Sequence, residues 1–453
     1  MYLNREKHCK STHNSTQPCL AEASLLAMAK SPHVEPFLFC LLEDFRWHVR
    51  EYHGDQPTQR LPSLTNPVHP IFKLERWATH PGQHFVEIYQ RILPALQLAS
   101  LFLCEDGPLL WYSRLTFSER RLNSAGKAYL VPTPYSTTPQ ALALVKTNLK
   151  NLSKVITFMF APQDFHKKQN WGTAYHRREN MPFFQELRTE NLPFVPPSSG
   201  IANPSIVLSR RFDIFFHKTF ATPHQNLDKY YRALLMLASV IGHEVAHSYN
   251  FFVHGAYGPL EPFWDITEKS GELGYSWQWN ILGCVPLPMG SKAGDDDNGR
   301  FYPLAIVKIE EYHSKADQER IMGAIKASTN AEFTQRDSSG NRRTWPAVDV
   351  TKFRGSTWGP DETAMGFVAS ILSIRPRWIA GWFQQTLWKN IKTNWTQKQY
   401  YLPPSLGECF VIMYDRSASA TYIQRPLHPG NEVDIKIIRH RRVREGGPIL
   451  VKR

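Results

Sequence analysis

The 453-residue sequence has few cysteines, and their arrangement excludes two common roles. There are six, and no two of them form a Cys-x-x-Cys pair, so the sequence contains neither a zinc knuckle nor a dithiol redox motif. Six cysteines in a chain of this length are also too few for a scaffold built on disulfides. Reduced, mostly buried thiols are therefore expected.

Long apolar runs are missing as well. No stretch approaches the roughly 18 apolar residues that cross a bilayer. The first residues, Met-Tyr-Leu-Asn-Arg-Glu-Lys-His, lack the apolar centre of a secretory signal peptide. Together these absences predict an intracellular, cytoplasmic protein with no membrane partner. On that prediction the glycosylation sequons at Asn14, Asn151 and Asn394 are chance matches.

Basic residues are in excess, but they do not gather into a patch. Lys and Arg number 53 against 40 Asp and Glu, which gives a formal net charge of +13. Such a balance often accompanies binding to nucleic acid or to anionic surfaces. Here the positive charges are scattered, and the one dense cluster lies in residues 436–453. A nucleic-acid partner is therefore not expected, and 436–453 are interpreted as a basic C-terminal tail.

Composition divides the rest of the chain into three regions. Residues 1–33 are polar and predict a flexible N-terminal arm. Residues 34–152 carry apolar residues at helical spacing, above all at 85–104 and 139–152, and predict a mainly helical region. Residues 153–435 mix strand and helix patterns and predict a second domain that contains both. The fold class expected for the whole chain is α+β, without internal repeats.

Several short segments have the pattern of strands or helices. Strands are predicted at 109–112, 128–131, 155–160, 205–209, 302–307 and 410–414, and helices at 362–372 and 377–395. The aromatic residues Trp378, Trp382, Phe383 and Trp388 are expected in the core. For 205–209 two interpretations stay open: a strand that holds an extended peptide by strand addition, or an ordinary core strand.

The sequence Ile-Gly-His-Glu-Val-Ala-His-Ser at 241–248 contains His-Glu-x-x-His. On a helix, positions i and i+4 lie on one face, so His243 and His247 can reach the same metal ion. Glu244 can then approach a water molecule at that ion. The apolar residues that precede the motif at helical spacing predict a helix that ends near Gly255. Gly242, beside the first histidine, leaves room either for a substrate backbone or for close helix packing.

A catalytic zinc site usually has three protein ligands, so one more is needed. A metzincin would continue the motif with a glycine and a third histidine, but Asn250 and Val253 occupy those positions. His254 falls one residue late and is interpreted as a helix-end histidine. The remaining option is a glutamate from a second helix, as in thermolysin-like enzymes.

Two glutamates are candidates for that third ligand. Residues 265–275 are interpreted as the start of a helix on which Glu268, Glu272 and Tyr275 share one face. Glu268 lies 21 positions after His247 (268 − 247), a short spacing that resembles thermolysin-like enzymes, and Glu272 lies 25 positions after it (272 − 247). A capping box from Asp265 to Glu268 would occupy Glu268 at the helix end, which favours Glu272. Both glutamates remain candidates, and whichever does not bind the metal is expected to support the one that does.

A resemblance adds to these motifs. The run IGHEVAHSYNFF…EPFWDITEKSGELGYSWQWNILG resembles the core of a group of large, mostly uncharacterised fungal zincin-like proteins. They share the His-Glu-x-x-His helix and a Glu-Leu-Gly-x-x-Trp segment that ends in Gly-Gly, where this chain has Gly283-Cys284. The aromatic stretch at 376–384 is similar too. The resemblance covers mainly residues 200–285, implies a zincin-like metallopeptidase fold, favours Glu272 as ligand and implies no particular substrate.

The motifs predict a zinc-dependent, gluzincin-like metallohydrolase that acts on a peptide or protein. Glu244 would take a proton from the zinc-activated water and pass it to the leaving amine. The oxyanion of the tetrahedral intermediate needs a donor, for which Tyr275 is the first candidate, with Tyr249, Tyr257 and His313 behind it. Two alternatives are a catalytically inactive binding or scaffold protein on the same fold and a zinc hydrolase that cleaves a non-peptide amide. The oligomeric state does not follow from the sequence.

Overall fold

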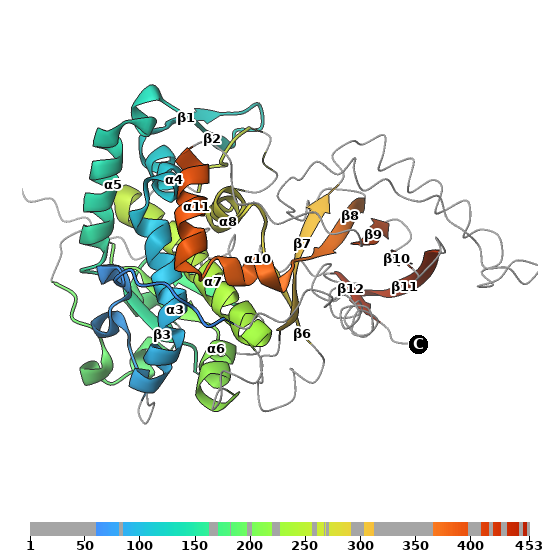
Figure 1. Cartoon of the computed structure of the whole chain (residues 1–453). Helices are drawn as coiled ribbons and strands as arrows, with labels where there is room; N and C mark the ends of the chain where they lie inside the picture. The colour runs from blue at the N-terminus through green and yellow to red at the C-terminus, as the bar shows by residue number, and fades with distance from the viewer. Residues whose placement is uncertain are drawn as a thin grey trace, which may run out of the picture.

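The structure is a computed structural model of the whole chain, and it mixes helices with small sheets, consistent with the α+β class (Figure 1). The residues that it describes are 60–80, 85–162, 171–181, 183–196, 202–219, 227–255, 261–266, 268, 271–290, 303–311, 366–396, 409–415, 420–426, 433–443 and 447–450. The expected N-terminal arm, residues 1–33, lies outside them. So do the candidates Tyr257 and His313.

One 28-residue helix, α7 (Leu227–His254), lies at the centre of the helical part. From Tyr230 to Asn250 every residue except His243 is buried. A helix buried on all sides needs neighbours on all sides. Those of α7 include α3 (Phe85–Cys104), α8 (Leu273–Leu282), α10 (Pro376–Gly381), β4 (Gly172–Tyr175) and β5 (Ser205–Leu208). The predicted end is confirmed, because α7 stops at His254 and Gly255 follows with φ of 81°.

The described residues before 153 are mainly helical. Helices α3 and α5 (Pro139–Leu152) coincide with the predicted 85–104 and 139–152. Pro94 lies inside α3 without breaking it. The predicted strand at 128–131 is β2 (Ala128–Val131), which forms a hairpin with β1 (Glu119–Leu122).

The strand predicted at 109–112 is wrong, because these residues belong to α4 (Asp106–Phe117). Aromatic residues favour strands through packing rather than through their backbone, so a packed helix can hold them equally well. In α4, Trp111 stacks on Trp264 at a centroid distance of 5.1 Å, and Tyr112 meets Tyr249 edge to face at the same distance. Tertiary packing therefore decides the secondary structure here.

A three-stranded sheet lies against α7 in the order β3-β5-β4, with β3 at Thr157–Phe160. The predicted strands at 155–160 and 205–209 are confirmed as β3 and β5. β5 runs parallel to β3 and antiparallel to β4, and its four residues are buried. Because both sides of β5 are paired, it cannot accept an added peptide strand. Strand addition at 205–209 is therefore wrong, and β4 takes the edge of the sheet instead.

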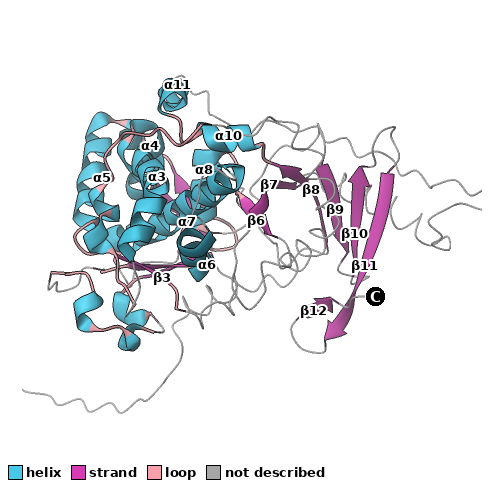
Figure 2. Ribbon diagram, turned by 60° about the horizontal axis from the view of Figure 1, so that its bottom comes forward, coloured by secondary structure: helices cyan, strands magenta, loops and turns pink. Residues whose placement is uncertain are grey.

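A second sheet has seven antiparallel strands, each paired with the next along the chain, and lies beside the helices (Figure 2). Its strands are β6 (Leu287–Gly290), β7 (Pro303–Glu311), β8 (Gly366–Ser373), β9 (Cys409–Asp415), β10 (Ala420–Pro426), β11 (Val433–Val443) and β12 (Gly447–Leu450). β11 spans residue 436, where the sequence suggested that a basic tail begins. The basic segment thus contributes strands to this sheet.

Sequence patterns identified two of these seven strands, assigned a third to a helix and did not predict the other four. The predictions at 302–307 and 410–414 correspond to β7 and β9. The helix predicted at 362–372 is wrong, because β8 occupies Gly366–Ser373. Short apolar runs such as this one fit a strand and a buried helix equally well. Pairing with β7 and β9 resolves the ambiguity.

The chain returns to the helical part through α10 and α11 (Gln385–Thr396), where the sequence predicts one helix over 377–395. Lys392 of α11 forms an ion pair with Glu105 at 2.6 Å. The four aromatic residues of this segment are buried as predicted, and Trp382 packs against Phe102 at 5.7 Å. Segments nearly 280 residues apart in sequence thus share one core.

Shorter helical turns complete the described fold. They are η1 (Pro70–Phe72), η2 (Leu74–Arg76), η3 (Pro134–Thr137), η5 (Arg178–Asn180), η6 (Phe184–Glu186), η7 (Thr189–Asn191), α6 (Arg210–Ile214) and the π-helical turn η8 (Phe215–Thr219). None of the helices in the described ranges combines the length and the apolar character that spanning a membrane requires.

Candidate metal centre

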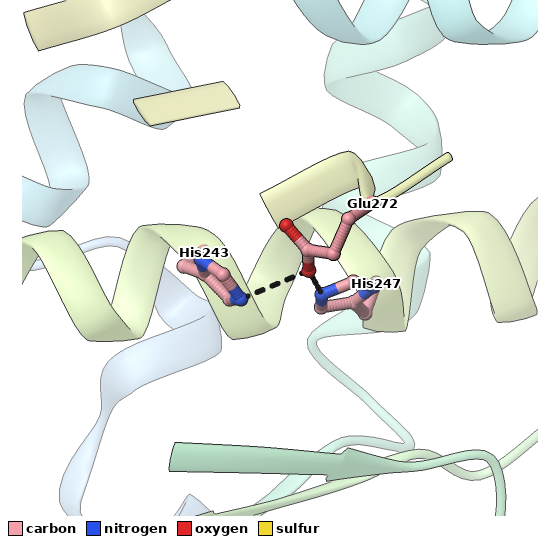
Figure 3. A group of neighbouring side chains, drawn as sticks. All are labelled: His243, His247 and Glu272. Carbon is pink, nitrogen blue, oxygen red and sulfur yellow. Dashed lines mark ion pairs between the residues drawn. The ribbon is translucent and has the colours of Figure 1, made fainter. Parts of the chain in front are cut away.

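Two histidines of α7 and one glutamate at the start of α8 converge on one point (Figure 3). His243 and His247 are one helical turn apart, so both rings leave the same side of α7. Oε1 of Glu272 lies 3.1 Å from Nε2 of His243 and 2.6 Å from Nε2 of His247. The potential ligand atoms of the three residues lie within 4.8 Å of one another, which is close enough to bind a single ion.

Glu272 is held in place by the helix that it caps. It is the N-cap residue of α8, and its Oε2 accepts a hydrogen bond from the backbone N–H of Tyr275. Burial alone would raise the pKa of Glu272, but the two histidines outweigh burial and hold this pKa below its usual value. Glu272 therefore presents a charged carboxylate, with one oxygen on the helix end and the other toward the histidines.

Glu268, the other candidate ligand, is occupied elsewhere. The helix predicted to start at residue 265 starts at Leu273 instead, so Glu268 and Glu272 do not share a helix face. Oε2 of Glu268 accepts the backbone N–H of Trp264 at 2.5 Å, and its Oε1 accepts the hydroxyl of Ser276. The structure thus places Glu272, and not Glu268, against the two histidines.

Glu244 is buried between α7 and the edge strand β4. Its Oε1 lies 4.0 Å from Nε2 of His243, and its carboxylate accepts a hydrogen bond from the backbone N–H of Ala174. Burial raises the pKa of Glu244, and the neighbouring histidines oppose this effect. A carboxylate with a raised pKa beside a candidate metal site is suited to accept a proton from water.

His247 lies between two carboxylates. Its Nδ1 is 2.6 Å from Oε1 of Glu261, and its Nε2 is 2.6 Å from Oε1 of Glu272. Burial would lower the pKa of His247, but these two glutamates raise it well above its usual value. The carboxylates thus require positive charge at the imidazole, which a proton or a metal ion can supply.

The donor set is one that zinc uses, and non-haem iron(II) uses the same residue types. Two imidazole nitrogens and one carboxylate oxygen form the ligand set of catalytic zinc sites that keep a fourth position for water. Harder ions such as calcium take six to eight oxygen ligands. The residues present at this site therefore suit zinc.

Two glycines allow the helices of the site to approach each other. A Cβ on Gly242 of α7 would lie 2.1 Å from the ring of Trp277, and a Cβ on Gly274 of α8 would lie 2.3 Å from the ring of His243. Gly242 thus faces the core and serves helix packing, not a substrate backbone. Each helix accommodates a ring of the other, and this close contact brings Glu272 to the histidines.

The structure also reveals a residue that sequence reasoning missed. Glu261 lies 14 positions after His247, outside any helix or strand, and its carboxylate reaches the ring nitrogen of His247 that faces away from Glu272. Nothing in its spacing distinguishes it from other loop acids. The one available signal was that a metal-binding histidine usually needs a carboxylate or carbonyl partner.

The other site candidates have different surroundings. The ring of Tyr275 meets that of His243 edge to face at 5.1 Å, so Tyr275 borders the site. Tyr249 is buried, and its hydroxyl lies 2.9 Å from that of Thr116 in the core. His254 is at the end of α7, outside the group formed by His243, His247 and Glu272.

Comparisons with known proteins identified no relative of this chain. No family model, curated protein or solved structure matches this chain. The chemistry of the site must therefore be inferred from its own geometry.

Glu268 provides a prediction about stability and pH. Burial raises the pKa of Glu268 to about 7, so the folded state favours its neutral form. In the unfolded chain this carboxyl ionises near its usual pKa, so the folded protein loses stability as pH rises from about 4.5 to about 7. The whole effect is about 3 kcal/mol. Glu268→Gln cannot ionise at this position. We expect its free energy of unfolding, relative to that of the unchanged protein, to be higher at pH 8 than at pH 4 by about that amount.

Urea unfolding of the two metal-free proteins at pH 4 and pH 8 measures this difference. The amide can still accept the N–H of Trp264 and donate to Ser276, so the variant keeps both contacts. A stability difference that is the same at both pH values would contradict the raised pKa.

Proposed function

We propose that this protein is a zinc-dependent hydrolase of the zincin type, and most specifically a peptidase. The observation that carries the proposal is the convergence of Nε2 of His243, Nε2 of His247 and Oε1 of Glu272, with the buried carboxylate of Glu244 beside them. Bound at these three atoms, zinc would supply a Lewis acid and lower the pKa of water from its bulk value to about 7. The protein residues supply the remaining steps.

Glu244 is the general base in this proposal. Its carboxylate, oriented by the N–H of Ala174, accepts a proton from the attacking water and delivers it to the leaving nitrogen. Tyr275 is the proposed donor to the oxyanion, and its ring contact with His243 keeps it at the border of the site. Glu272 stays charged throughout, because the end of α8 and the histidines stabilise its anion.

Strand β4 supports a peptide as the substrate. It is the edge strand of its sheet, and Ala174 turns its N–H away from β5 toward Glu244. In an antiparallel strand the N–H and C=O of one residue point the same way, so the C=O of Ala174 also faces the site. An extended peptide that added to this edge would bring its backbone next to Glu244.

The test is metal-dependent cleavage of peptides by the purified full-length chain. We expect the zinc-loaded protein to hydrolyse members of a mixed-sequence fluorogenic peptide library. A strong chelator should abolish the activity, and added zinc should restore it. His247→Ala should be inactive under all three conditions.

Two results would redirect the proposal. If the zinc-loaded protein leaves every peptide intact but hydrolyses small amides, the substrate is a non-peptide amide. If it binds zinc but hydrolyses neither class, the protein is an inactive zincin-type binding protein.

A further inference from the structure

We propose that Glu261 is a positioning residue that couples His247 to the third ligand, Glu272. This inference rests on the proposed zinc function. Oε1 of Glu261 lies 2.6 Å from Nδ1 of His247, and its Oε2 accepts the backbone N–H of Leu273 at 3.3 Å. Leu273 is the first residue of α8 and directly follows Glu272. One carboxylate thus holds a histidine of α7 and the start of the helix that carries the glutamate.

The contact with His247 determines which ring nitrogen is free to bind metal. A carboxylate accepts hydrogen bonds, so Nδ1 of His247 carries the hydrogen and donates it to Glu261. In the neutral ring Nε2 is then the nitrogen with a lone pair, and Nε2 is the atom that faces Oε1 of Glu272. The negative charge of Glu261 also makes His247 a stronger donor to a cation.

The contact with Leu273 sets the position of Glu272. At the start of a helix the backbone N–H groups lack partners within the helix. Oε2 of Glu261 takes the N–H of Leu273, while Oε2 of Glu272 takes that of Tyr275. Two carboxylates therefore share the end of α8, and each of them also contacts one ring nitrogen of His247. If Glu261 shifted, the ring of His247 and the carboxylate of Glu272 would both lose a constraint.

Glu261 is itself held by segments far away in the sequence. Two residues later, Phe263 adds to strand β2: its N–H donates to the carbonyl of Ala128 at 2.8 Å, and its carbonyl accepts from Leu130 at 3.0 Å. The next residue, Trp264, stacks on Trp111, and its carbonyl accepts from Arg114 at 2.6 Å. Helix α4 and the β1–β2 hairpin thus fix the loop that carries Glu261. The N-terminal helical region supports the metal site through this loop.

The test compares zinc affinity in full-length variants. Glu261→Gln keeps the shape of the side chain and removes its charge, and Glu261→Ala removes the contact. We expect zinc to bind about 10- to 100-fold more weakly to Glu261→Gln, and at least as weakly to Glu261→Ala, in competition with a chromophoric chelator. In the cobalt-substituted protein, the visible absorption spectrum of Glu261→Gln should shift, because the ring of His247 is less constrained.

Glu105→Gln is the matched control. The side chain of Glu105 is 18% exposed and forms an ion pair at 2.6 Å with Lys392, whereas that of Glu261 is 19% exposed. The control loses a similar ion pair outside the metal site, so its zinc affinity and cobalt spectrum should match those of the unchanged protein. Thermal unfolding of the metal-free forms reports whether each variant folds.

The outcomes separate this inference from the proposed function. A folded Glu261→Gln variant whose zinc affinity and cobalt spectrum equal those of the control would overturn the positioning role and leave the zinc function intact. If the unchanged protein bound no zinc, the proposed function itself would fail. If Glu261→Ala did not fold, Glu261→Gln alone would decide the question.

Discussion

Replacing Glu244 by Gln is expected to abolish peptide hydrolysis while zinc stays bound. The amide has nearly the same shape and can still accept the N–H of Ala174, but it cannot take a proton from water. The carboxylate of Glu244 is not part of the converging group of His243, His247 and Glu272. We expect kcat/KM to fall by about 10³-fold or more, the upper part of the range for general-base catalysis.

Steady-state hydrolysis and zinc content, measured on the same preparations, test this prediction. Glu105→Gln again serves as the control, since its ion pair with Lys392 lies outside the metal site, and it should keep full activity. If Glu244→Gln hydrolysed peptides within a few-fold of the unchanged protein, Glu244 would not be the general base. If it lost zinc instead, Glu244 would have a structural role in the metal site.

Adding one methyl group at Gly274 is expected to destroy the metal site. The Cβ of an alanine there would lie 2.3 Å from Cδ2 and Nε2 of His243, whose ring also packs against the rings of His247 and Tyr275 and cannot simply move aside. Helix α8 would have to move away from α7 and would carry Glu272 with it. We expect zinc affinity to fall by at least about 100-fold, which is more than the loss of a hydrogen-bond partner of one metal ligand usually costs. The metal-free protein should lose about 1 to 3 kcal/mol of stability through overpacking.

Gly126→Ala is the control for this substitution. Gly126 lies between β1 and β2 with φ of 73°, and no atom lies within 4 Å of a Cβ built there. An alanine at this position strains only the local backbone, at a cost of roughly 1 to 2 kcal/mol, and should leave zinc binding unchanged. Zinc titration and urea unfolding of both variants give the comparison. Undiminished zinc affinity in Gly274→Ala would contradict the close packing of the two helices.

Local patterns in the sequence were enough to predict the central part of the site. The spacing of His243 and His247 fixes their common face once the segment is helical, and the apolar residues before them make it helical. A catalytic zinc site usually takes a third protein ligand, and Glu272 was one of the two glutamates considered for it. Here chemistry and local periodicity lead to the same residues.

What the sequence could not predict depends on tertiary contacts. The segment at 265–272 has a helical pattern, but α8 begins only at Leu273, with Glu272 as its N-cap residue. The carboxylate of Glu268 accepts hydrogen bonds from Trp264 and Ser276 instead of facing the histidines. Glu261 gains its role only because Phe263 pairs with β2, a strand about 130 residues earlier in the chain.

In the fold, too, local patterns predicted some elements, and tertiary contacts decided others. Long segments with clear helical periodicity, such as 85–104 and 139–152, were predicted with the correct boundaries. Two short apolar segments were predicted wrongly: residues 109–112 are helical and 366–373 form a strand, in each case because packing or pairing overrides the local preference. For 205–209 the sequence left strand addition and an ordinary core strand both open, because strand order cannot be deduced from one strand alone.

The zinc content of the purified protein and three variants tests the central claim most directly. We expect one zinc ion per chain in the unchanged protein, and its loss in His247→Ala and in Glu272→Ala, each of which removes one of the three converging donor groups. Glu268→Ala should retain zinc, because the carboxylate of Glu268 binds Trp264 and Ser276 instead. Zinc retained in Glu272→Ala and lost in Glu268→Ala, or no zinc in the unchanged protein, would contradict the proposed metal site.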